Sequence, residues 1–139
     1  MRLWLFIVLL IPIAVFLGSE AEAGCTGDQP PLVSNQNWII TQDTHCWDKE
    51  ISVRDIEVND GSFMLENVTL EATGKILLNQ RTDWLQSTII HNTTTNSNHL
   101  DVNALVIIKG TNLTINAPEH VYGGSGFQGM KLSANSKLI

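Results

Sequence analysis

The residues with the widest chemical range in this sequence are its four histidines, His45, His91, His99 and His120. Metal sites need neutral imidazoles, thiolates or carboxylates that converge on one point. No two of these histidines are spaced to share a face of one helix or strand, but His91, His99 and Asp101 could bracket a single loop and bind a metal ion. The alternative is a set of solvated loop side chains, and the spacing favours it. We therefore predict no metal and no cofactor.

The two cysteines, Cys25 and Cys46, are the next candidates for chemistry. An even number of cysteines in an exported chain favours a disulfide, because such compartments are oxidising. The loop that this bond would close holds about 20 residues, for which the chain-entropy model gives about 3 kcal/mol of stabilisation. Two unpaired thiols are the alternative. Zinc has no support, since His45 is the one histidine nearby and no Cys-x-x-Cys is present.

Three asparagines match the pattern for N-linked glycosylation: Asn67, Asn92 and Asn112. Asn92 lies in the polar stretch HNTTTNSN and is the acceptor that we expect to be exposed and modified. Asn67 and Asn112 have a structural alternative. Asn67 precedes Val68 at an expected sharp corner, where its amide could satisfy backbone groups. Buried in that role, Asn67 would carry no glycan.

The first residues have the pattern of a secretory signal peptide. A basic residue precedes an apolar run at residues 3–17, and small residues follow up to Ala23, after which we expect cleavage. An uncleaved anchor is the alternative, but the run is shorter than the ~20 residues of a spanning helix and contains Pro12. A lipoprotein signal would modify Cys25, yet Glu22 stands where an aliphatic residue is usual. We predict a secreted or cell-surface protein.

Length and charge exclude several classes of function. The chain has 139 residues and a formal net charge of −6, and removal of the signal peptide leaves a normal length for one domain. No cluster of Lys and Arg is present, so nucleic acids and anionic membranes are poor partners. The one expected route to a membrane is the signal segment, if it stays uncleaved.

From Trp38 onward the chain alternates apolar and polar residues in very short runs, such as residues 56–58, 63–65 and 68–70. β-Branched residues dominate these runs, and turn residues interrupt them every few positions. No helical stripe is present after the signal segment. The pattern predicts an all-β protein.

One sequence cassette recurs: two apolar residues around a polar one, a small turn, and another apolar stretch. The copies are residues 56–65, 106–115 and 130–139. Their turn residues Gly61, Gly110 and Asn135 tolerate a positive φ. They are 49 and 25 positions apart, which indicates a period of about 25 with a missing copy in residues 72–90. Periods of this size are typical of solenoids.

A parallel β-helix explains such short strands, because each strand pairs with its equivalent in the next rung rather than along the chain. The predicted inward columns are Ile56 with Val106 and Met130, and Leu65 with Leu113 and Leu138. The polar residues 91–103 are predicted to form a loop outside the helix. The alternative is an antiparallel β-sandwich in which Asp60 and Gly61 make a hairpin. The recurring cassette favours the solenoid.

The stretches IEVNDGSFMLENVTL, VIIKGTNLTIN and MKLSANSKLI resemble the N-terminal rungs of right-handed parallel β-helix repeat regions in secreted microbial, often archaeal, surface proteins. The broader fold group is pectin-lyase-like. The resemblance covers residues 38–139 and rests on repeat pattern, not on a catalytic signature. With it we expect a signal peptide at 1–23, a lead-in and cap at 24–50 and rungs at 51–139. Trp38 and Trp47 would cover the open N-terminal end.

Enzymes of the group that this chain resembles cleave acidic polysaccharides with clustered Asp residues and an Arg or Lys base, or with paired carboxylates. The outward acidic residues expected here are Glu57, Glu66, Glu71, Asp83 and Asp101. They are scattered, and neither Arg54 nor Arg81 stands beside a carboxylate cluster. A platform of Trp38, Trp47 and Trp84 for sugar stacking is a further option, but we prefer the cap.

The sequence therefore predicts a noncatalytic extracellular β-helix module with a surface-layer, adhesion or scaffold role. The alternative is the N-terminal part of a polysaccharide lyase or hydrolase of the pectin-lyase-like fold. Expected partners are cell-surface glycans or other surface-protein subunits. The sequence ends half-way through a rung, because residues 130–139 supply only its opening half. We expect a longer chain or self-association there, because an open end exposes apolar residues and strand edges.

Overall fold

The computed structural model describes residues 22–95 and 100–116, together with the backbone pairing of three short strands within residues 121–138. The predicted signal peptide lies outside the described residues except for Glu22 and Ala23, and so do His99, His120 and most of the expected open end. All regular structure in the described residues is β. No helix in this part of the chain has the length and apolar character to span a membrane.

The strands form three sheets, which we call A, B and C. Sheet A contains β1 (Gly24–Thr26), β3 (Thr44–Trp47), β6 (Phe63–Glu66), β9 (Thr82–Leu85), β12 (Val106–Lys109) and β15 (Met130–Leu132). Sheet B contains β2 (Trp38–Ile40), β5 (Ile56–Val58), β8 (Ile76–Leu78), β11 (Leu100–Val102) and β14 (Val121–Tyr122). Sheet C contains β4 (Glu50–Val53), β7 (Thr69–Ala72), β10 (Thr88–Asn92), β13 (Asn112–Asn116) and β16 (Lys137–Leu138).

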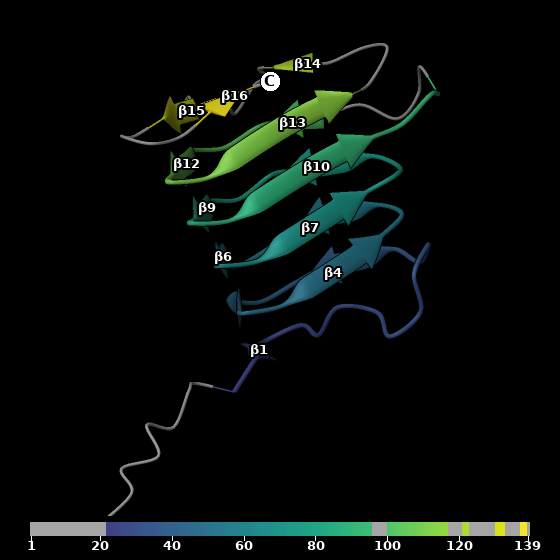
Figure 1. Cartoon of the computed structure of the whole chain (residues 1–139), viewed down its shortest axis with the longest axis vertical. Helices are drawn as coiled ribbons and strands as arrows, with labels where there is room; N and C mark the ends of the chain where they lie inside the picture. Colours follow the sequence, from purple (N-terminus) through teal and green to yellow (C-terminus); the bar gives the residue numbers. More distant parts are fainter. Residues whose placement is uncertain (1–21, 96–99, 117–120, 123–129, 133–136, 139) are drawn as a thin grey trace, which may run out of the picture.

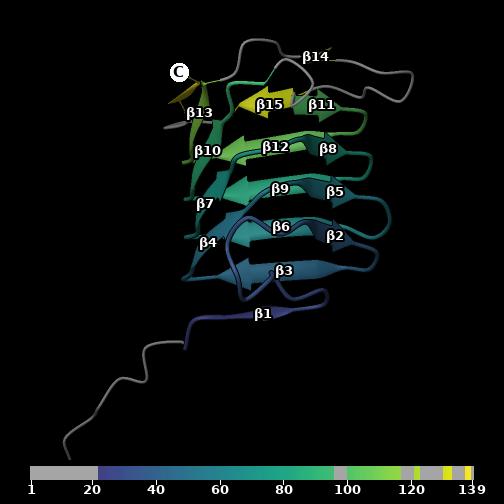
Figure 2. The same ribbon diagram turned by 90° about the vertical axis from the view of Figure 1, so that its right-hand side faces the viewer.

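The chain visits sheets B, A and C in turn and then repeats, and we call one such passage a circuit. Equivalent strands of successive circuits lie side by side and parallel, stacked along the long axis of the molecule (Figures 1 and 2). Among the described strands, only β1 and β3 pair antiparallel. The alternative, an antiparallel sandwich with a hairpin at Asp60 and Gly61, is wrong, since the strands on either side of these residues belong to different sheets.

The circuits have two lengths rather than one period of 25. Val68 and Ser87, equivalent corner residues, are 19 positions apart, and Ser87 and Thr111 are 24 apart. The longer spacing arises where extra residues enter between β10 and β11. That loop is shorter than the predicted 91–103, because His91 belongs to β10 and β11 already contains Leu100 to Val102. Residues 72–90, predicted as a missing copy, form an ordinary circuit.

The predicted columns are half right. Val106 pairs with Met130, and Leu113 pairs with Leu138. Ile56 instead pairs with Trp38 and Ile76, and Leu65 pairs with Cys46 and Trp84. The error has a simple origin: the cassette at 56–65 runs from sheet B to sheet A, whereas those at 106–115 and 130–139 run from sheet A to sheet C.

The interior is filled by the inward residues of all three sheets. Leu65 is fully buried and Thr69 is exposed, as the alternation predicts. Trp38 is also buried and meets Phe63 edge-on, with ring centroids 5.1 Å apart. Trp84 lies in the same interior. Stacked apolar columns of this kind remove large side chains from water and are the main source of stability of the fold.

Buried hydroxyl groups satisfy the backbone where the chain turns from sheet A to sheet C. The Val68 amide donates to Ser87 Oγ at 3.1 Å, and the Ser87 amide donates to Thr111 Oγ1 at 3.1 Å. Thr111 Oγ1 in turn donates to the Trp84 carbonyl at 2.9 Å. Unpaired buried polar groups are costly, so these side chains hold each corner directly over the one before it.

The lead-in lies at the N-terminal end of the stacked strands (Figure 2). β1 lies antiparallel on β3 and is joined to it by the Cys25–Cys46 disulfide, which confirms the predicted pairing. Asp28 accepts from the Thr41 amide and the Gln42 side chain, so it ties the lead-in to the first circuit. Parallel pairing already begins at Trp38, which places the start of the repeating circuits before residue 51.

Candidate ligand-binding groove

The corners between sheets A and C carry a column of residues with left-handed backbone. The column consists of Asp48 (φ 53°), Asn67 (φ 52°), Gln86 (φ 50°) and Gly110 (φ 61°). Only glycine adopts this conformation without cost, and Asn and Asp tolerate it better than other residues. The sharp turn that results leaves the polar side chains of this column exposed at the surface.

Two adjoining hollows lie along this corner, and we call them together the corner groove. The first has a volume of about 460 Å³ and the second about 180 Å³, and both are bordered by Glu66 and Gln86. The lining residues are Trp47, Asp48, Glu66, Asn67, Leu85, Gln86 and Lys109. They come from the ends of sheet A strands and the corner residues that follow, in four successive circuits. The groove therefore runs along the axis of the molecule.

Trp47 is the aromatic residue of the groove, and the chain before it fixes its position. The Trp47 indole Nε1 donates to the Glu22 carbonyl at 2.8 Å. Gly24 is the cross-strand partner of Trp47, and a Cβ on Gly24 would lie 2.9 Å from Cζ2 of the ring. Only glycine allows so close a contact. The half-buried ring also lies beside His45, with centroids 5.2 Å apart.

The groove is polar and carries more acidic than basic side chains. Asn67 Nδ2 donates to Asp48 Oδ1 at 2.6 Å, which orients both groups. Glu66 lies 3.5 Å from His45 Nε2. Lys109 is the basic residue that lines the groove. Carboxylates, amides, an indole and an ammonium in one row can bind hydroxyl-rich ligands by hydrogen bonds and pack against a flat apolar face.

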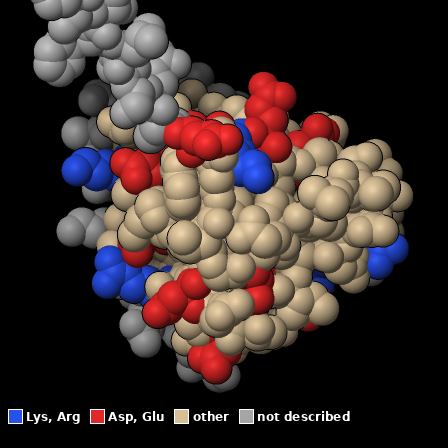
Figure 3. Space-filling model, turned by 90° about the horizontal axis from the view of Figure 1, so that it is seen from below, with Lys and Arg blue, Asp and Glu red and all other residues tan. Residues whose placement is uncertain are grey.

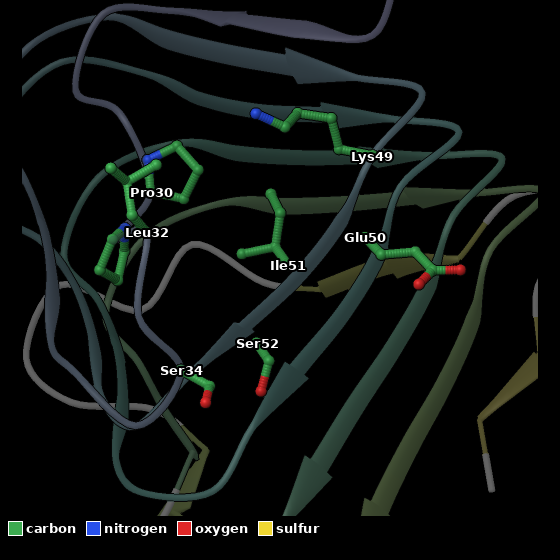
Figure 4. Close-up of a pocket in the computed structure, with 8 residues that line it drawn as sticks. Pro30, Leu32, Ser34, Lys49, Glu50, Ile51 and Ser52 are labelled. Carbon is green, nitrogen blue, oxygen red and sulfur yellow. The ribbon is translucent and has the colours of Figure 1, made fainter.

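A separate hollow of about 280 Å³ lies between the lead-in and β4. Figure 4 shows Ile51 between the lead-in residues Pro30 and Leu32 and the side chain of Glu50, which points away from them. Proline has no N–H, so the lead-in cannot pair as a strand with β4 at Pro30. This hollow is a gap left by that imperfect cover, and its polar lining residues are Ser34, Lys49, Glu50 and Ser52.

The outer surface at the N-terminal end is unevenly charged. Seen from that end, acidic side chains gather on two opposite sides, with uncharged residues between them (Figure 3). The acidic residues named from the sequence are distributed over all three sheets: Glu57 and Asp101 on sheet B, Glu66 and Asp83 on sheet A, and Glu71 on sheet C. Arg81 contacts Asp83 through two hydrogen bonds of 2.9 and 3.3 Å, and Arg54 contacts Asp55 at 3.3 Å.

The loop positions predicted for His45 and His91 are wrong, and those predicted for His99 and His120 lie outside the described residues. His45 lies in β3 and His91 in β10, so neither is a loop residue. His91 is fully buried, and its Nε2 lies 2.6 Å from the Gly74 carbonyl oxygen. Within residues 22–95 and 100–116, no three His, Cys, Asp or Glu side chains group in a way that could hold a metal ion.

The three tryptophans do not form one platform, since Trp38 and Trp84 are interior residues. Of the glycosylation candidates, Asn92 ends β10, Asn112 begins β13 and Asn67 stands at the corner, and all three are exposed. The alternative in which Asn67 is buried is therefore wrong, although Asn67 does stand at a sharp corner. Sequence reasoning missed the groove, although Asp48 and Asn67, residues that tolerate positive φ, stand 19 positions apart at two of its corners.

No protein-family model, curated protein or solved structure matches this chain. Its function is therefore argued from its own residues.

Proposed function

We propose that this chain is a noncatalytic extracellular module with the right-handed parallel β-helix fold, which acts at a cell surface and binds neutral glycan chains in the corner groove. The fold is supported by three parallel sheets that the chain visits in turn. Parallel strands joined by crossovers are almost always right-handed. The Cys25–Cys46 disulfide supports an oxidising, extracellular location.

The observation that carries the proposal is the axial row of Asp48, Asn67 and Gln86 beside Trp47. Equivalent positions in successive circuits repeat at about 4.8 Å, the spacing of paired strands. This spacing is comparable with the length of one pyranose unit in an extended chain. The corner groove can therefore offer one polar group to each sugar, while the Trp47 ring packs against the C–H face of another.

Charge selects among glycans. Asp48 and Glu66 face the groove against the single ammonium of Lys109, and the whole chain has a formal net charge of −6. Uronic acid polymers are repelled by such a surface, because like charges in a shared cleft raise the cost of association. Neutral chains of hexose or N-acetylhexosamine carry no charge, so the acidic surface adds no electrostatic cost to their binding.

A polysaccharide hydrolase is the second candidate, and one observation favours it. Asp48 and Glu66 line the same hollow, and glycoside hydrolases use a pair of carboxylates on either side of the scissile bond. Against this, Asp48 Oδ1 is held by Asn67, and Glu57, Glu71 and Asp101 lie on sheets B and C. Binding without turnover is the function that this arrangement supports best.

The test is binding and turnover measured on one panel of glycans. Isothermal titration with neutral oligosaccharides should show binding that Trp47→Ala weakens at least about tenfold, as loss of a stacked ring does. Ile39→Ala removes an exposed apolar side chain on sheet B and serves as the matched control, with unchanged affinity. Incubation with neutral and acidic glycans, with and without calcium, should release no product. Reducing sugars or unsaturated-product absorbance that Asp48→Asn abolishes would establish the hydrolase or lyase instead.

A further inference from the structure

The N-terminal side of the corner groove contains a feature that glycan binding alone does not explain. Trp47 donates its indole N–H to the carbonyl of Glu22 at 2.8 Å. The expected cleavage of the signal peptide falls after Ala23, one residue beyond that carbonyl. Export of the chain would therefore remove the acceptor of this hydrogen bond.

We propose that cleavage between Ala23 and Gly24 completes the corner groove by releasing the indole N–H of Trp47 and by placing the new α-ammonium of Gly24 against the ring. A signal peptidase hydrolyses the Ala23–Gly24 peptide bond with one water molecule. Ala23 leaves with the new carboxylate, and Gly24 keeps the nitrogen, which takes up a proton to become the ammonium. This inference rests on the proposed export of the chain.

The geometry around Gly24 supports the position of that ammonium. Gly24 pairs with Trp47 across the strands, and the neighbouring Cys25 is bonded to Cys46. The new terminus is thus held one residue from a covalent cross-link. The nitrogen is bonded to the same Cα whose Cβ position lies 2.9 Å from Cζ2 of the Trp47 ring. Cations within about 6 Å of an indole centroid are attracted to its face.

The charges around this point favour the ammonium. Asp48 and Glu66 line the same hollow as Trp47, and carboxylates stabilise a nearby cation. His45 lies beside the ring, at 5.2 Å between centroids, so its imidazole is a second ionisable group near the indole. The α-amino group titrates near 7.7–8.0 when unperturbed. Substitution of His45 removes the imidazole and leaves the α-ammonium as the group that is followed.

The consequence for the ligand is a changed set of donors. In the uncleaved chain, the Trp47 indole N–H is occupied by Glu22. In the processed chain, that N–H and the Gly24 ammonium become donors at the end of the groove where Asp48 lies. A glycan hydroxyl or an N-acetyl carbonyl can then accept from the indole. Processing would therefore convert a groove whose indole N–H is bonded to Glu22 into one whose indole N–H can bind a ligand.

The test compares three forms of the chain: one that begins at Gly24, the same form with its α-amino group acetylated, and one that keeps Glu22 and Ala23 and is acetylated at Glu22. Trp47 fluorescence is followed against pH, with Trp47→Phe to assign the signal and His45→Gln to remove the neighbouring imidazole. The Gly24 form should show a transition at about pH 8 or above, which acetylation and the two extra residues both abolish. Identical titrations of the three forms would overturn the proposal.

A second readout separates the two parts of the account. The ¹H–¹⁵N signal of the Trp47 indole should exchange with water faster in the Gly24 form than in the form that keeps Glu22. Equal exchange would show that Glu22 does not occupy the indole. N-terminal sequencing of the protein recovered from the medium of a secreting host should begin at Gly24. A different first residue, or a chain retained in the cell, would contradict the processing step. The fluorescence titration would still decide whether an ammonium at Gly24 interacts with the Trp47 ring.

Discussion

Asn67 donates a hydrogen bond from its side-chain amide to the carboxylate of Asp48, 2.6 Å away, and both residues have left-handed backbone at equivalent corners of successive circuits. The two residues thus form the left-handed turns and also supply polar groups at the surface of those turns. A residue at this corner must therefore tolerate a positive φ, and its side chain also determines which hydrogen bonds the surface can make.

This relationship predicts different costs for two substitutions at Asn67. Asn67→Ala must keep a positive φ of 52°, which costs an ordinary L-residue about 1–2 kcal/mol. Asn67→Gly loses the same hydrogen bond to Asp48 without that strain. We expect the glycine variant to be the more stable by about 1 kcal/mol in urea unfolding of protein made without glycosylation. Equal stabilities, or a more stable alanine variant, would contradict the left-handed corner.

The inward and outward sides of neighbouring strands predict a second contrast. Leu65 is fully buried among apolar residues, whereas Thr69 is exposed on sheet C. Leu65→Asp should unfold the protein, because an unpaired buried carboxylate costs several kcal/mol against a total stability of about 5–15. Thr69→Asp should fold normally. Thermal unfolding of the two variants measures the difference, and similar melting temperatures would show that the register is wrong.

The alternation that places Leu65 and Thr69 is local, so the sequence alone reveals it. The assignment of each strand to a sheet is not local. The cassettes at 56–65 and 130–139 are alike in residue pattern, yet they span different corners, because any apolar strand followed by a tight turn has this pattern. His91 shows the same limit. Its polar neighbours indicate a loop, but its burial depends on the Gly74 carbonyl, 17 positions earlier.

The contacts between the lead-in and the first circuit should be the first to be lost as the pH falls. The Thr41 amide and the Gln42 side chain lower the pKa of Asp28 from its ordinary 3.8, and the Ser62 amide lowers that of Asp43. A carboxylate with a lowered folded pKa contributes stability above its unfolded pKa and loses it as the pH falls through the folded value. Stability should therefore decline below about pH 4.

Asp28→Asn and Asp43→Asn test this pH dependence. Each variant should be less stable than the native chain at pH 7, and the difference should shrink as the pH falls below about 4. Glu57→Gln on sheet B is the control, since this side chain is not a hydrogen-bond partner of Asp28 or Asp43. Urea unfolding at several pH values provides the comparison. A deficit that stays constant with pH would exclude these carboxylates as the cause.

The disulfide predicts a measurable loss on reduction. Cys25 and Cys46 are 21 positions apart, and closing a loop of this size is worth about 3 kcal/mol in the chain-entropy model. Urea unfolding with and without reductant should show a loss of that order, together with release of β1 from the edge of β3. Alkylation of unreduced protein should label neither cysteine. Two labelled thiols on the secreted protein would show that the Cys25–Cys46 disulfide does not form.

Chemical-shift mapping of a neutral oligosaccharide on the ¹⁵N-labelled protein measures glycan binding in the corner groove most directly. The shifts should concentrate at the corner groove, on Trp47, Asp48, Glu66, Asn67, Gln86 and Lys109, and should be absent with a uronic acid oligomer of equal length. Shifts confined to the outer faces of sheets B or C, or a preference for the uronic acid oligomer, would contradict glycan binding in the groove.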